Sequence, residues 1–447
     1  MNKTSRKIFV FILILVLTSF ACQAVTNTPT PLPTALPNTI TPEPTATVEV
    51  IPTPTQNSQR SFLQEDLSTK EQLSIFKDLW DVVNEEYLYE DFNGLDWDQT
   101  FLDTNLLIEA GLRNVEFYEL MYELVYGLGD QHSVFLTPAE VDAEEADYLG
   151  ESDYGGIGVW VSIIPERDRA VVLLTFKDGP AEKAGIKSHD SILFVGDLPV
   201  LTEHDTLSDQ IIGTPGTSVT ITVQTPGEDP REITLVREKI VATYPVPFET
   251  LDSPGKLKIG YLFIPTFSEN SIDNQVGEAL EEMGELDGLI IDNRFNGGGF
   301  DNVMGNTISY FVSGIVGHFT NRNQQEALNI RPKHIFNSQE MPLVVLVGEG
   351  TVSFGEISSG ILQDQERAYL IGQTTDGNVE TLWGYDFKDG SRAWIAHDTF
   401  KPINHPEIDW ENDGIIPDLT VESDWDFVTL DTDPVILAAL EYFDSIE

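Results

Sequence analysis

The sequence contains a single cysteine, Cys22, among 447 residues. One cysteine excludes an intramolecular disulfide framework and a zinc site built on cysteine pairs. Basic residues are also scarce, because 25 Lys and Arg stand against 74 Asp and Glu, for a formal net charge of -49. A surface this acidic repels phosphate groups, so we predict no nucleic-acid partner. The sequence lacks a P-loop, a dinucleotide fingerprint and a zinc motif, and therefore implies no cofactor and no metal.

Long apolar runs are absent too, since the N-terminal run covers only residues 8–17. It follows the basic residues Lys3, Arg6 and Lys7, which is typical of a signal peptide and too short for a membrane span. The run ends in Thr18-Ser-Phe-Ala-Cys22, which resembles a bacterial lipoprotein cleavage box with Cys22 as the acylated residue. Two acyl chains would give stable membrane attachment. Secretion after ordinary signal cleavage, with Cys22 incidental, is the alternative.

The next segment is of low complexity, with 8 Pro and 10 Thr in residues 26–56. Such a composition buries almost no apolar surface and favours extended polyproline II conformations of about 3.1 Å per residue. We therefore expect residues 1–21 to be a signal peptide and residues 22–61 to be a lipid-anchored tether. It would hold a folded body away from a membrane, outside the cytoplasm.

Three folded segments follow. Residues 62–150 carry apolar residues at helical spacing, with Thr69 and Gln72 as an expected capping box, and predict a helical N-terminal domain. Residues 151–242 carry short β runs around Gly179-Pro-Ala-Glu-Lys-Ala-Gly-Ile186. Residues 243–447 alternate strand and helix patterns, including the apolar runs at 288–292 and 343–347, and predict an α/β core.

The middle segment resembles a PDZ domain. The resemblance rests on the Gly-Pro-Ala-x-x-Ala-Gly-Ile turn between strands and on Ile211-Ile-Gly-Thr-Pro-Gly-Thr217 before a β run. PDZ domains bind extended chain ends by adding a strand to a sheet edge. The resemblance makes Gly155, Gly156, Ile157 and Gly158 the carboxylate-binding loop; a glycine-rich turn without a ligand is the alternative.

The last segment resembles the tail-specific, or C-terminal processing, serine peptidases. The motifs are Leu289-Ile-Ile-Asp-Asn-Arg-Phe-Asn-Gly-Gly-Gly299 and Val345-Leu-Val-Gly-Glu-Gly-Thr-Val-Ser-Phe-Gly-Glu-Ile357. A helical cap, a PDZ domain and an α/β core also come in that family's order. The fold class implied is a multidomain α+β protein with a crotonase-like (ββα) peptidase core.

Ser353 is the expected nucleophile, because it follows an apolar strand and opens a helix. The Phe354 N–H, with a backbone N–H at Gly298 or Gly299, would complete an oxyanion hole. An alternative role for Ser353 is helix capping, since Glu356 occupies the reciprocal position.

At the position of the general base, this sequence differs from many members of the family that it resembles. They place a lysine about 25 residues after the serine, whereas the corresponding stretch Gly372-Gln-Thr-Thr-Asp-Gly-Asn-Val379 has Asn378. An amide accepts no proton near neutral pH. Lys388 and Lys401 remain, outside any matching motif.

A second branch of the family, similar to the core of tricorn protease, uses a histidine and a C-terminal glutamate. Their counterparts are His132 in Gly129-Asp-Gln-His-Ser133 and Glu411 in Glu411-Asn-Asp-Gly-Ile-Ile-Pro-Asp418. Histidine suits the task because its ordinary pKa lies near 6.5. That branch has a serine before the histidine, where this sequence has Gln131, and Ser133 follows instead. The other histidines are interpreted as surface or hairpin residues, with His397 and His405 as possible neighbours of the site.

Two classes of function follow. The first is an extracytoplasmic serine endopeptidase that acts on polypeptides and engages their C-terminal or extended segments through its PDZ domain. The second is a non-catalytic, peptide- or ligand-binding relative, favoured by Asn378 and Gln131. The sequence sets no oligomeric state.

Overall fold

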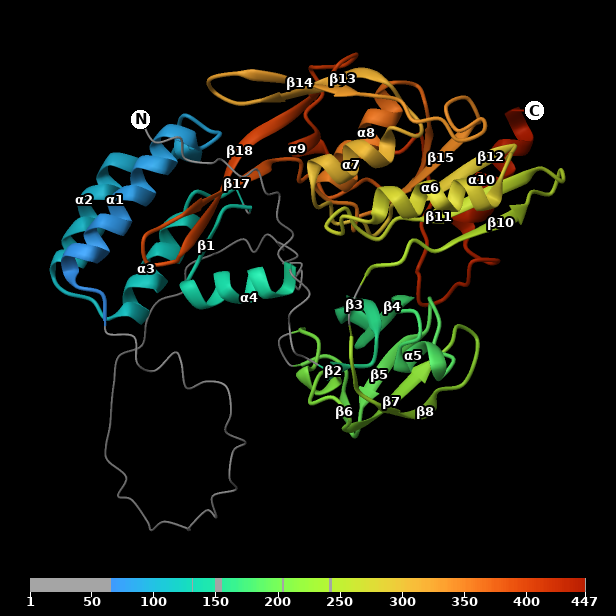
Figure 1. Cartoon of the computed structure of the whole chain (residues 1–447), viewed down its shortest axis with the longest axis horizontal. Helices are drawn as coiled ribbons and strands as arrows, with labels where there is room; N and C mark the ends of the chain where they lie inside the picture. Colours follow the sequence, from blue (N-terminus) through green and yellow to red (C-terminus); the bar gives the residue numbers. More distant parts are fainter. Residues whose placement is uncertain (1–65, 131, 149–154, 203–204, 241–242, 447) are drawn as a thin grey trace, which may run out of the picture. The chain divides into compact units, whose positions relative to one another are not determined.

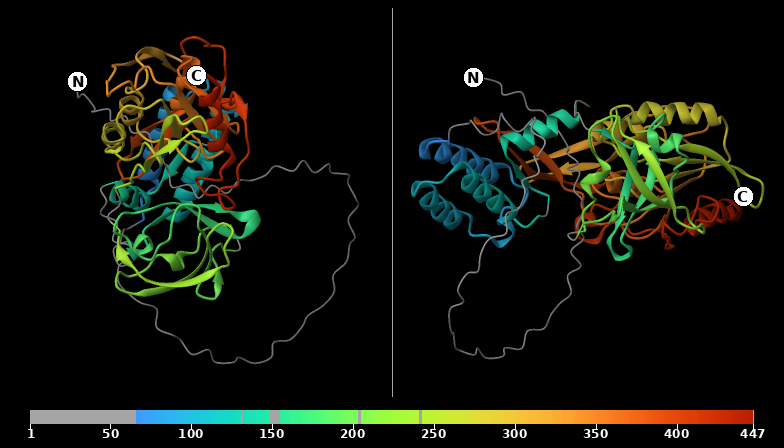
Figure 2. Two further views of the ribbon diagram at one scale, coloured as in Figure 1. Left: turned by 90° about the vertical axis from the view of Figure 1, so that its right-hand side faces the viewer. Right: turned by 90° about the horizontal axis from the view of Figure 1, so that it is seen from below.

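The computed structural model describes residues 66–130, 132–148, 155–202, 205–240 and 243–446. The predicted signal peptide, Cys22 and the tether lie outside these residues. Among the described residues, no helix combines the length and the apolar character that a membrane span requires. The described residues form four β-sheets, of six, six, five and two strands (Figures 1 and 2).

The central sheet has the strand order β10-β11-β12-β15-β16-β19, in which β10 is antiparallel and the others are parallel. Its strands are β10 (Phe248–Asp252), β11 (Lys258–Phe263), β12 (Gly288–Asp292), β15 (Leu343–Val347), β16 (Tyr369–Gly372) and β19 (Leu419–Thr420). The predicted runs at 288–292 and 343–347 are confirmed as β12 and β15. Both strands are buried along their whole length, because parallel strands in an α/β core are covered on both faces.

Alternate residues of β12 face different helices. Leu289 and Ile291 belong to the apolar cluster that contains α6 (Ile272–Met283), α7 (Asp301–Ile308) and α8 (Phe354–Asp364). Ile290 belongs to the cluster that contains α10 (Pro434–Ile446). Figure 1 shows α6, α7 and α8 on one side of the sheet. The period of two along a strand therefore places three helices against one face and one against the other.

A second sheet runs β1-β18-β13-β14, with β17 paired to β18. Its strands are β1 (Val134–Leu136), β13 (Gly314–Thr320), β14 (Gln325–Ile330), β17 (Thr381–Asp386) and β18 (Arg392–Pro402). Val134 of β1 pairs with Trp394 of β18. The strand that follows the N-terminal helices therefore joins the β17–β18 hairpin, which comes near the C-terminal end of the core.

The N-terminal helices pack on this hairpin. They are α1 (Thr69–Glu86), α2 (Trp97–Glu109) and α3 (Asn114–Tyr126), and α4 (Pro138–Tyr148) follows β1. Phe76, Phe117 and Met121 share one apolar cluster with Ala393 and Ile395 of β18. The capping box of α1 is formed by Ser68 and Glu71, not by Thr69 and Gln72, because Gln72 is buried and bonds Leu112.

The β-rich segment forms a sheet in the order β3-β4-β5-β7-β8, with β6 on β5, and a short β2–β9 ladder. The elements are β2 (Gly155–Gly156), β3 (Val159–Ile164), β4 (Arg169–Thr175), α5 (Pro180–Lys183), β5 (Ser191–Val195), β6 (Leu198–Pro199), β7 (Ser218–Gln224), β8 (Arg231–Val236) and β9 (Glu238–Lys239). Figure 2 shows this sheet in green. The predicted β runs and the short helix are thus present.

Candidate active site

Ser353 lies in the turn between β15 and α8, as the sequence predicts. Its backbone has φ 55° and ψ -125°, a conformation that costs a non-glycine residue free energy and that occurs at functional sites. Its N–H donates to the carbonyl oxygen of Asn378 at 2.8 Å and to Glu356 Oε2 at 3.2 Å. Ser353 and Glu356 together form a capping box at the start of α8. The strained turn therefore presents the Ser353 hydroxyl at the start of a helix.

The glycine loop lies directly against this turn. A Cβ atom placed on Gly298 would lie 2.7 Å from Ser353 Cβ and 2.8 Å from Phe354 N, and φ there is +89°. A Cβ on Gly299, with φ +141°, would lie 2.1 Å from the carbonyl carbon of Phe267. Both glycines are therefore required by close backbone approach as well as by conformation.

The two glycine N–H groups differ. The Gly298 N–H donates to Asn296 Oδ1 at 2.9 Å, whereas the Gly299 N–H has no acceptor among the described residues. The Phe354 N–H, at the first turn of α8, is likewise free of a described acceptor, as expected for a helix N-terminus. Of the expected oxyanion donors, the N–H groups of Gly299 and Phe354 are thus available to bind an oxyanion. Gly298, whose N–H is already bonded, contributes by having no side chain that would collide with Ser353 and Phe354.

Gly298→Ala is expected to lower kcat/KM by on the order of 100-fold or more, the usual cost of disturbing one oxyanion donor. The reason is the collision of the new methyl group with Ser353 and with the Phe354 N–H. Steady-state kinetics on a peptide measures it, and Gly305→Ala in α7, where the nearest atom to a Cβ is 3.6 Å away, is the matched control. Unchanged kinetics for Gly298→Ala would contradict this placement.

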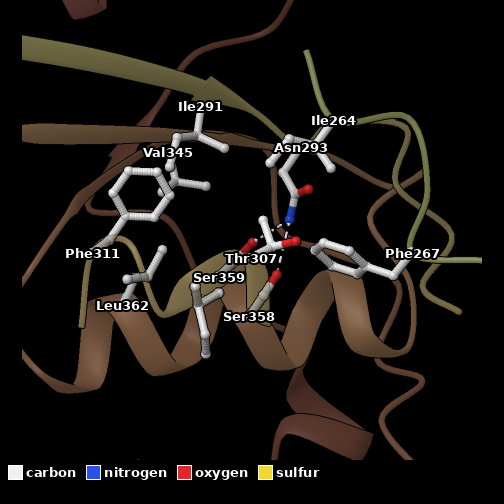
Figure 3. A pocket seen from close by; sticks show the side chains of 11 residues that line it. Ile264, Phe267, Ile291, Asn293, Thr307, Phe311, Val345, Ser358, Ser359 and Leu362 are labelled. Carbon is white, nitrogen blue, oxygen red and sulfur yellow. Dashed lines mark hydrogen bonds between the residues drawn. The ribbon is translucent and has the colours of Figure 1, made fainter. Parts of the chain in front are cut away.

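Asn293 fixes the first turn of α8 from behind. Its amide donates to the Gly355 carbonyl at 2.9 Å and to Ser359 Oγ at 2.8 Å, and its Oδ1 accepts from Asn296. Figure 3 shows Asn293 beside a cavity of about 10 Å³ that apolar side chains also line. The cavity is a packing gap inside the core, and the hydrogen bonds beside it lock the glycine loop to the helix that begins at Phe354.

Glu356 holds the segment before β17 against Ser353. Its buried carboxylate accepts from the N–H groups of Gly377 and Asn378, both at 2.8 Å, and from the Thr375 hydroxyl. Burial raises the pKa of Glu356 to about 7, against the lowering effect of these hydrogen bonds. Asn378 therefore contacts Ser353 through its backbone. Lys388 lies elsewhere, with Nζ 3.1 Å from Asp78 Oδ2 and 3.0 Å from Ser74 Oγ of α1.

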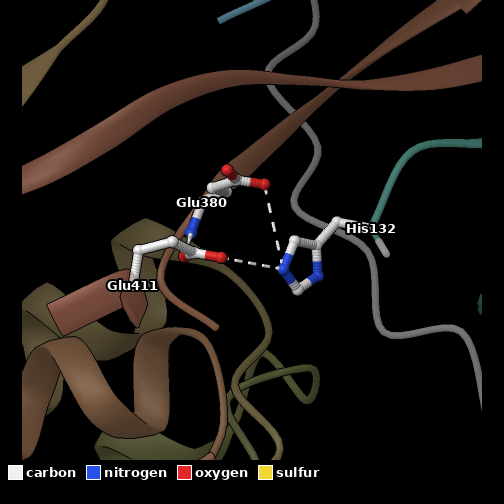
Figure 4. A group of neighbouring side chains, drawn as sticks. All are labelled: His132, Glu380 and Glu411. Carbon is white, nitrogen blue, oxygen red and sulfur yellow. Dashed lines mark hydrogen bonds and ion pairs between the residues drawn. The ribbon is translucent and has the colours of Figure 1, made fainter. Parts of the chain in front are cut away.

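His132 lies beside the expected glutamate. Its Nε2 is 3.2 Å from Glu411 Oε1 and 3.8 Å from Glu380 Oε2 (Figure 4). Its Nδ1 makes no hydrogen bond to a described residue. The contact with Glu411, which lies in α9 (Trp410–Asp413), is direct, without an intervening hydroxyl.

Ser133 has a structural role beside the histidine. Its hydroxyl donates to Asp130 Oδ2 at 2.6 Å and accepts from the Ala396 N–H at 3.0 Å. Asp130 Oδ1 also accepts from the His132 N–H at 2.9 Å. These contacts tie the loop after α3 to β18 and so set the position of His132. Gln131 lies outside the described residues.

Residues 378–380 connect the two halves of the site. The Asn378 carbonyl accepts from Ser353 N–H, and the next two N–H groups, of Val379 and Glu380, donate to Glu411 Oε2 at 2.7 and 3.1 Å. One short segment therefore touches the serine at one end and orients the partner of His132 at the other. The fold thus links Ser353, through residues 378–380, to the His132–Glu411 pair, although the three residues are far apart in sequence.

Glu380 is a member of this site that the sequence did not reveal. Its side chain is 1% exposed, and its Oε1 accepts from the Tyr89 hydroxyl. Burial first, and then the charge of Glu411, raise the pKa of Glu380 to about 8. No motif distinguishes it among 74 acidic residues; only its burial just before β17 does.

The electrostatic surroundings of His132 favour its protonated form. Burial alone would lower the pKa of its imidazole, but the hydrogen bond to Glu411 and the negative charges of Glu380, Glu411 and Asp130 outweigh burial and raise it. A histidine that gains its proton this easily suits a group that takes a proton from a hydroxyl.

The remaining histidines lie in other places. The surface interpretation of His189 is wrong: it is 5% exposed, stacks on Trp425 and bonds the Trp425 carbonyl at 2.9 Å. His397 is buried in the β17–β18 hairpin between Asp398 and Glu86. His405 bonds Asp364. The contacts of His397 and His405 are thus with carboxylates outside the group around His132.

The predicted carboxylate-binding loop is part of the β-rich segment. Gly155 and Gly156 pair with Lys239 and Glu238, and Gly158 has φ +75°. Ile157 is buried and its carbonyl accepts from the Ala181 N–H. The loop leads directly into β3, which lies at the edge of its sheet. This arrangement leaves a strand edge next to the glycine-rich turn.

The comparisons with known proteins agree with the fold. Residues 258–421 match the model of peptidase family S41. The chain is 29% identical to a carboxyl-terminal-processing protease of Synechocystis sp. over 365 residues, which cover 80% of this chain and 82% of the relative. It is 27% identical to a carboxy-terminal-processing protease of Bartonella bacilliformis over 79% of this chain and 76% of that protein.

Solved structures show the same fold. A photosystem II D1 C-terminal processing protease matches with a TM-score of 0.57 and 26% identity, over 83% of this chain and 97% of the other. An S41 protease from Bacteroides fragilis, described as putative, matches with a TM-score of 0.59 and 15% identity, over 83% and 97%. The protein is a serine-type hydrolase. Its residues 258–421 match peptidase family S41, and over most of its length it is similar to the C-terminal processing proteases.

Proposed function

We propose that this protein is an extracytoplasmic serine endopeptidase in which His132, rather than a lysine, is the general base. The observation that carries the proposal is the link made by residues 378–380 between Ser353 on one side and the His132–Glu411 pair on the other. The Ser353 hydroxyl attacks the scissile carbonyl carbon. His132 takes its proton and returns it to the leaving amine, and Glu411 stabilises the imidazolium. The N–H groups of Phe354 and Gly299 receive the oxyanion.

The surroundings of Ser353 and of His132 favour a histidine over a lysine as the base. Asn378 occupies the place next to Ser353 and offers an amide, which accepts no proton at neutral pH. His132 has a carboxylate on one ring nitrogen and an open second nitrogen, the arrangement of a base with its orienting group. These contacts support the proposal that the protein uses a histidine base.

Digestion of an unfolded protein by the full chain tests the proposal. Mass spectrometry is expected to show fragments that accumulate with time. Intact substrate at all enzyme concentrations, together with substrate binding, would instead support a non-catalytic peptide-binding relative.

The β-rich segment is proposed to act as a PDZ domain that binds the substrate's C-terminal end. A substrate strand would add to the free edge of β3, and the loop of Gly155, Gly156, Ile157 and Gly158 would receive the terminal carboxylate. The location outside the cytoplasm rests on the signal-like N-terminus and Cys22, and the mass of the N-terminal peptide from a membrane extract tests acylation there.

Amidating the C-terminus of a peptide substrate is expected to lower kcat/KM by about 10-fold, chiefly through KM, because uniform binding is lost while the chemistry is unchanged. The comparison uses two peptides of one sequence that end in a free carboxylate or an amide, so the enzyme itself is not altered. A peptide amidated only on an internal side-chain carboxyl, far from its end, is the control. Equal kinetics for the free-acid and the amidated peptide would contradict the proposal that residues 155–158 bind the terminal carboxylate.

A further inference from the structure

Three potential metal-ligand atoms meet beside the proposed base. His132 Nε2, one oxygen of Glu380 and one oxygen of Glu411 all lie within 4.8 Å of one another. They come from three separate segments: the loop after α3, the segment just before β17 and the helix α9. Figure 4 shows the two carboxylates directed at the same nitrogen of the imidazole ring.

Each carboxylate has one oxygen anchored and the other directed at His132. Glu411 Oε2 accepts from the N–H groups of Val379 and Glu380, which leaves Oε1 toward the imidazole. Glu380 Oε1 accepts from the Tyr89 hydroxyl, which leaves Oε2 toward the imidazole. Metal ligands are oriented in this way by hydrogen bonds to their far atoms.

The unpaired oxygen Oε2 of Glu380 is a second observation, separate from the clustering of the three side chains, that points to a bound cation. It has no hydrogen-bond partner among the described residues, although the Glu380 side chain is 1% exposed. A buried polar atom without a partner carries a desolvation cost. A cation bound between Glu380, Glu411 and His132 would give this oxygen a partner and balance two neighbouring carboxylates.

We infer that His132, Glu380 and Glu411 form a site for a divalent zinc ion. One imidazole nitrogen and two carboxylate oxygens are ligands that zinc accepts, and three protein ligands leave its fourth position open. Magnesium, in contrast, requires about six oxygen ligands in near-octahedral geometry and retains its water, so one nitrogen and two oxygens suit it poorly.

Bound zinc would prevent His132 from acting as a base. With the metal on Nε2, the neutral ring carries its remaining proton on Nδ1 and has no lone pair left to accept another. Zinc would also take Glu411 Oε1 away from the imidazole. Inhibition of cleavage by zinc therefore follows, and this consequence, unlike zinc binding itself, rests on the proposed function.

Zinc binding is measured on the full chain carrying Ser353→Ala, which separates binding from cleavage. Isothermal titration with ZnCl2, after treatment with a chelator, is expected to show one zinc per chain. Adding Glu380→Gln should raise the Kd by more than about 100-fold, and adding Tyr89→Phe by about 10-fold, as for a residue that orients a ligand. Glu86→Gln, which alters the separate His397 cluster, is the matched control and should leave the Kd unchanged. MgCl2 should bind far more weakly.

Absence of zinc uptake, or an equal Kd in the Glu380→Gln protein, would overturn the site. Circular dichroism shows whether the Glu380→Gln protein folds, and the milder Tyr89→Phe change carries the same test if it does not. Wild-type cleavage should fall on addition of zinc and recover with a chelator. Tight, Glu380-dependent zinc binding without inhibition would uphold the metal site and count against His132 as the base.

Discussion

Ser353→Ala is expected to lower kcat/KM on an unfolded polypeptide by at least about 10⁴-fold, because the attacking oxygen is lost and only binding and the oxyanion donors remain. The change removes one atom and at most one helix cap, typically worth about 1 kcal/mol, so the thermal unfolding midpoint should stay within a few degrees of wild type. Peptide release followed by mass spectrometry measures the activity, and a thermal melt measures the stability.

The exposed serine Ser218 on β7 provides the matched control. Ser218→Ala alters a hydroxyl with no role in the account and should keep wild-type kinetics. If Ser353→Ala cleaves at a rate close to that of Ser218→Ala, the nucleophile is another residue, and the strained turn before α8 serves only to cap the helix.

His132→Ala is expected to lose about as much activity as Ser353→Ala, and the double variant should lose little more, since the members of one catalytic unit are not additive. The imidazole is 3.2 Å from Glu411, so Glu411→Gln should also reduce kcat, by removing the charge that stabilises the imidazolium. Rate measurements on one peptide substrate for the single and double variants give the comparison.

Two control variants sharpen this prediction. His334→Ala changes an exposed histidine and should leave the cleavage rate unchanged. Asn378→Ala should remain largely active, because Asn378 uses its backbone N–H and carbonyl on Glu356 and Ser353. Near-full activity of His132→Ala alongside inactive Ser353→Ala would show that His132 is not the base, and a lysine elsewhere would have to be sought.

The sequence predicted the core strands well because they are short, apolar and buried on both faces. The runs at 288–292 and 343–347 coincide with β12 and β15. It did not predict that β1 pairs with β18, since Val134 and Trp394 are more than 250 positions apart and each strand alone has no distinctive pattern. Pairings this distant are set by packing rather than by local preference.

The candidate site was predictable only where a motif marked it. Ser353, the glycines and His132 stand in recognisable motifs, and the structure places Glu411 against His132. Glu380 and Tyr89 carry no such mark, because their roles arise from burial and from a contact across 291 positions. The inward position of His189 was missed for the same reason: its stacking partner, Trp425, comes from the far end of the chain.

The pH dependence of kcat/KM in the presence of a chelator tests the assignment of the base most directly. His132 must be neutral to accept the serine proton, and Glu411, Glu380 and Asp130 raise its pKa above the ordinary 6.5. Activity should therefore be low in acid and rise with pH through a single limb above 6.5, and the residual activity of His132→Ala should lack this limb. A wild-type profile that is flat across this range and rises only in the range of a lysine, with the same shape in His132→Ala, would contradict the account.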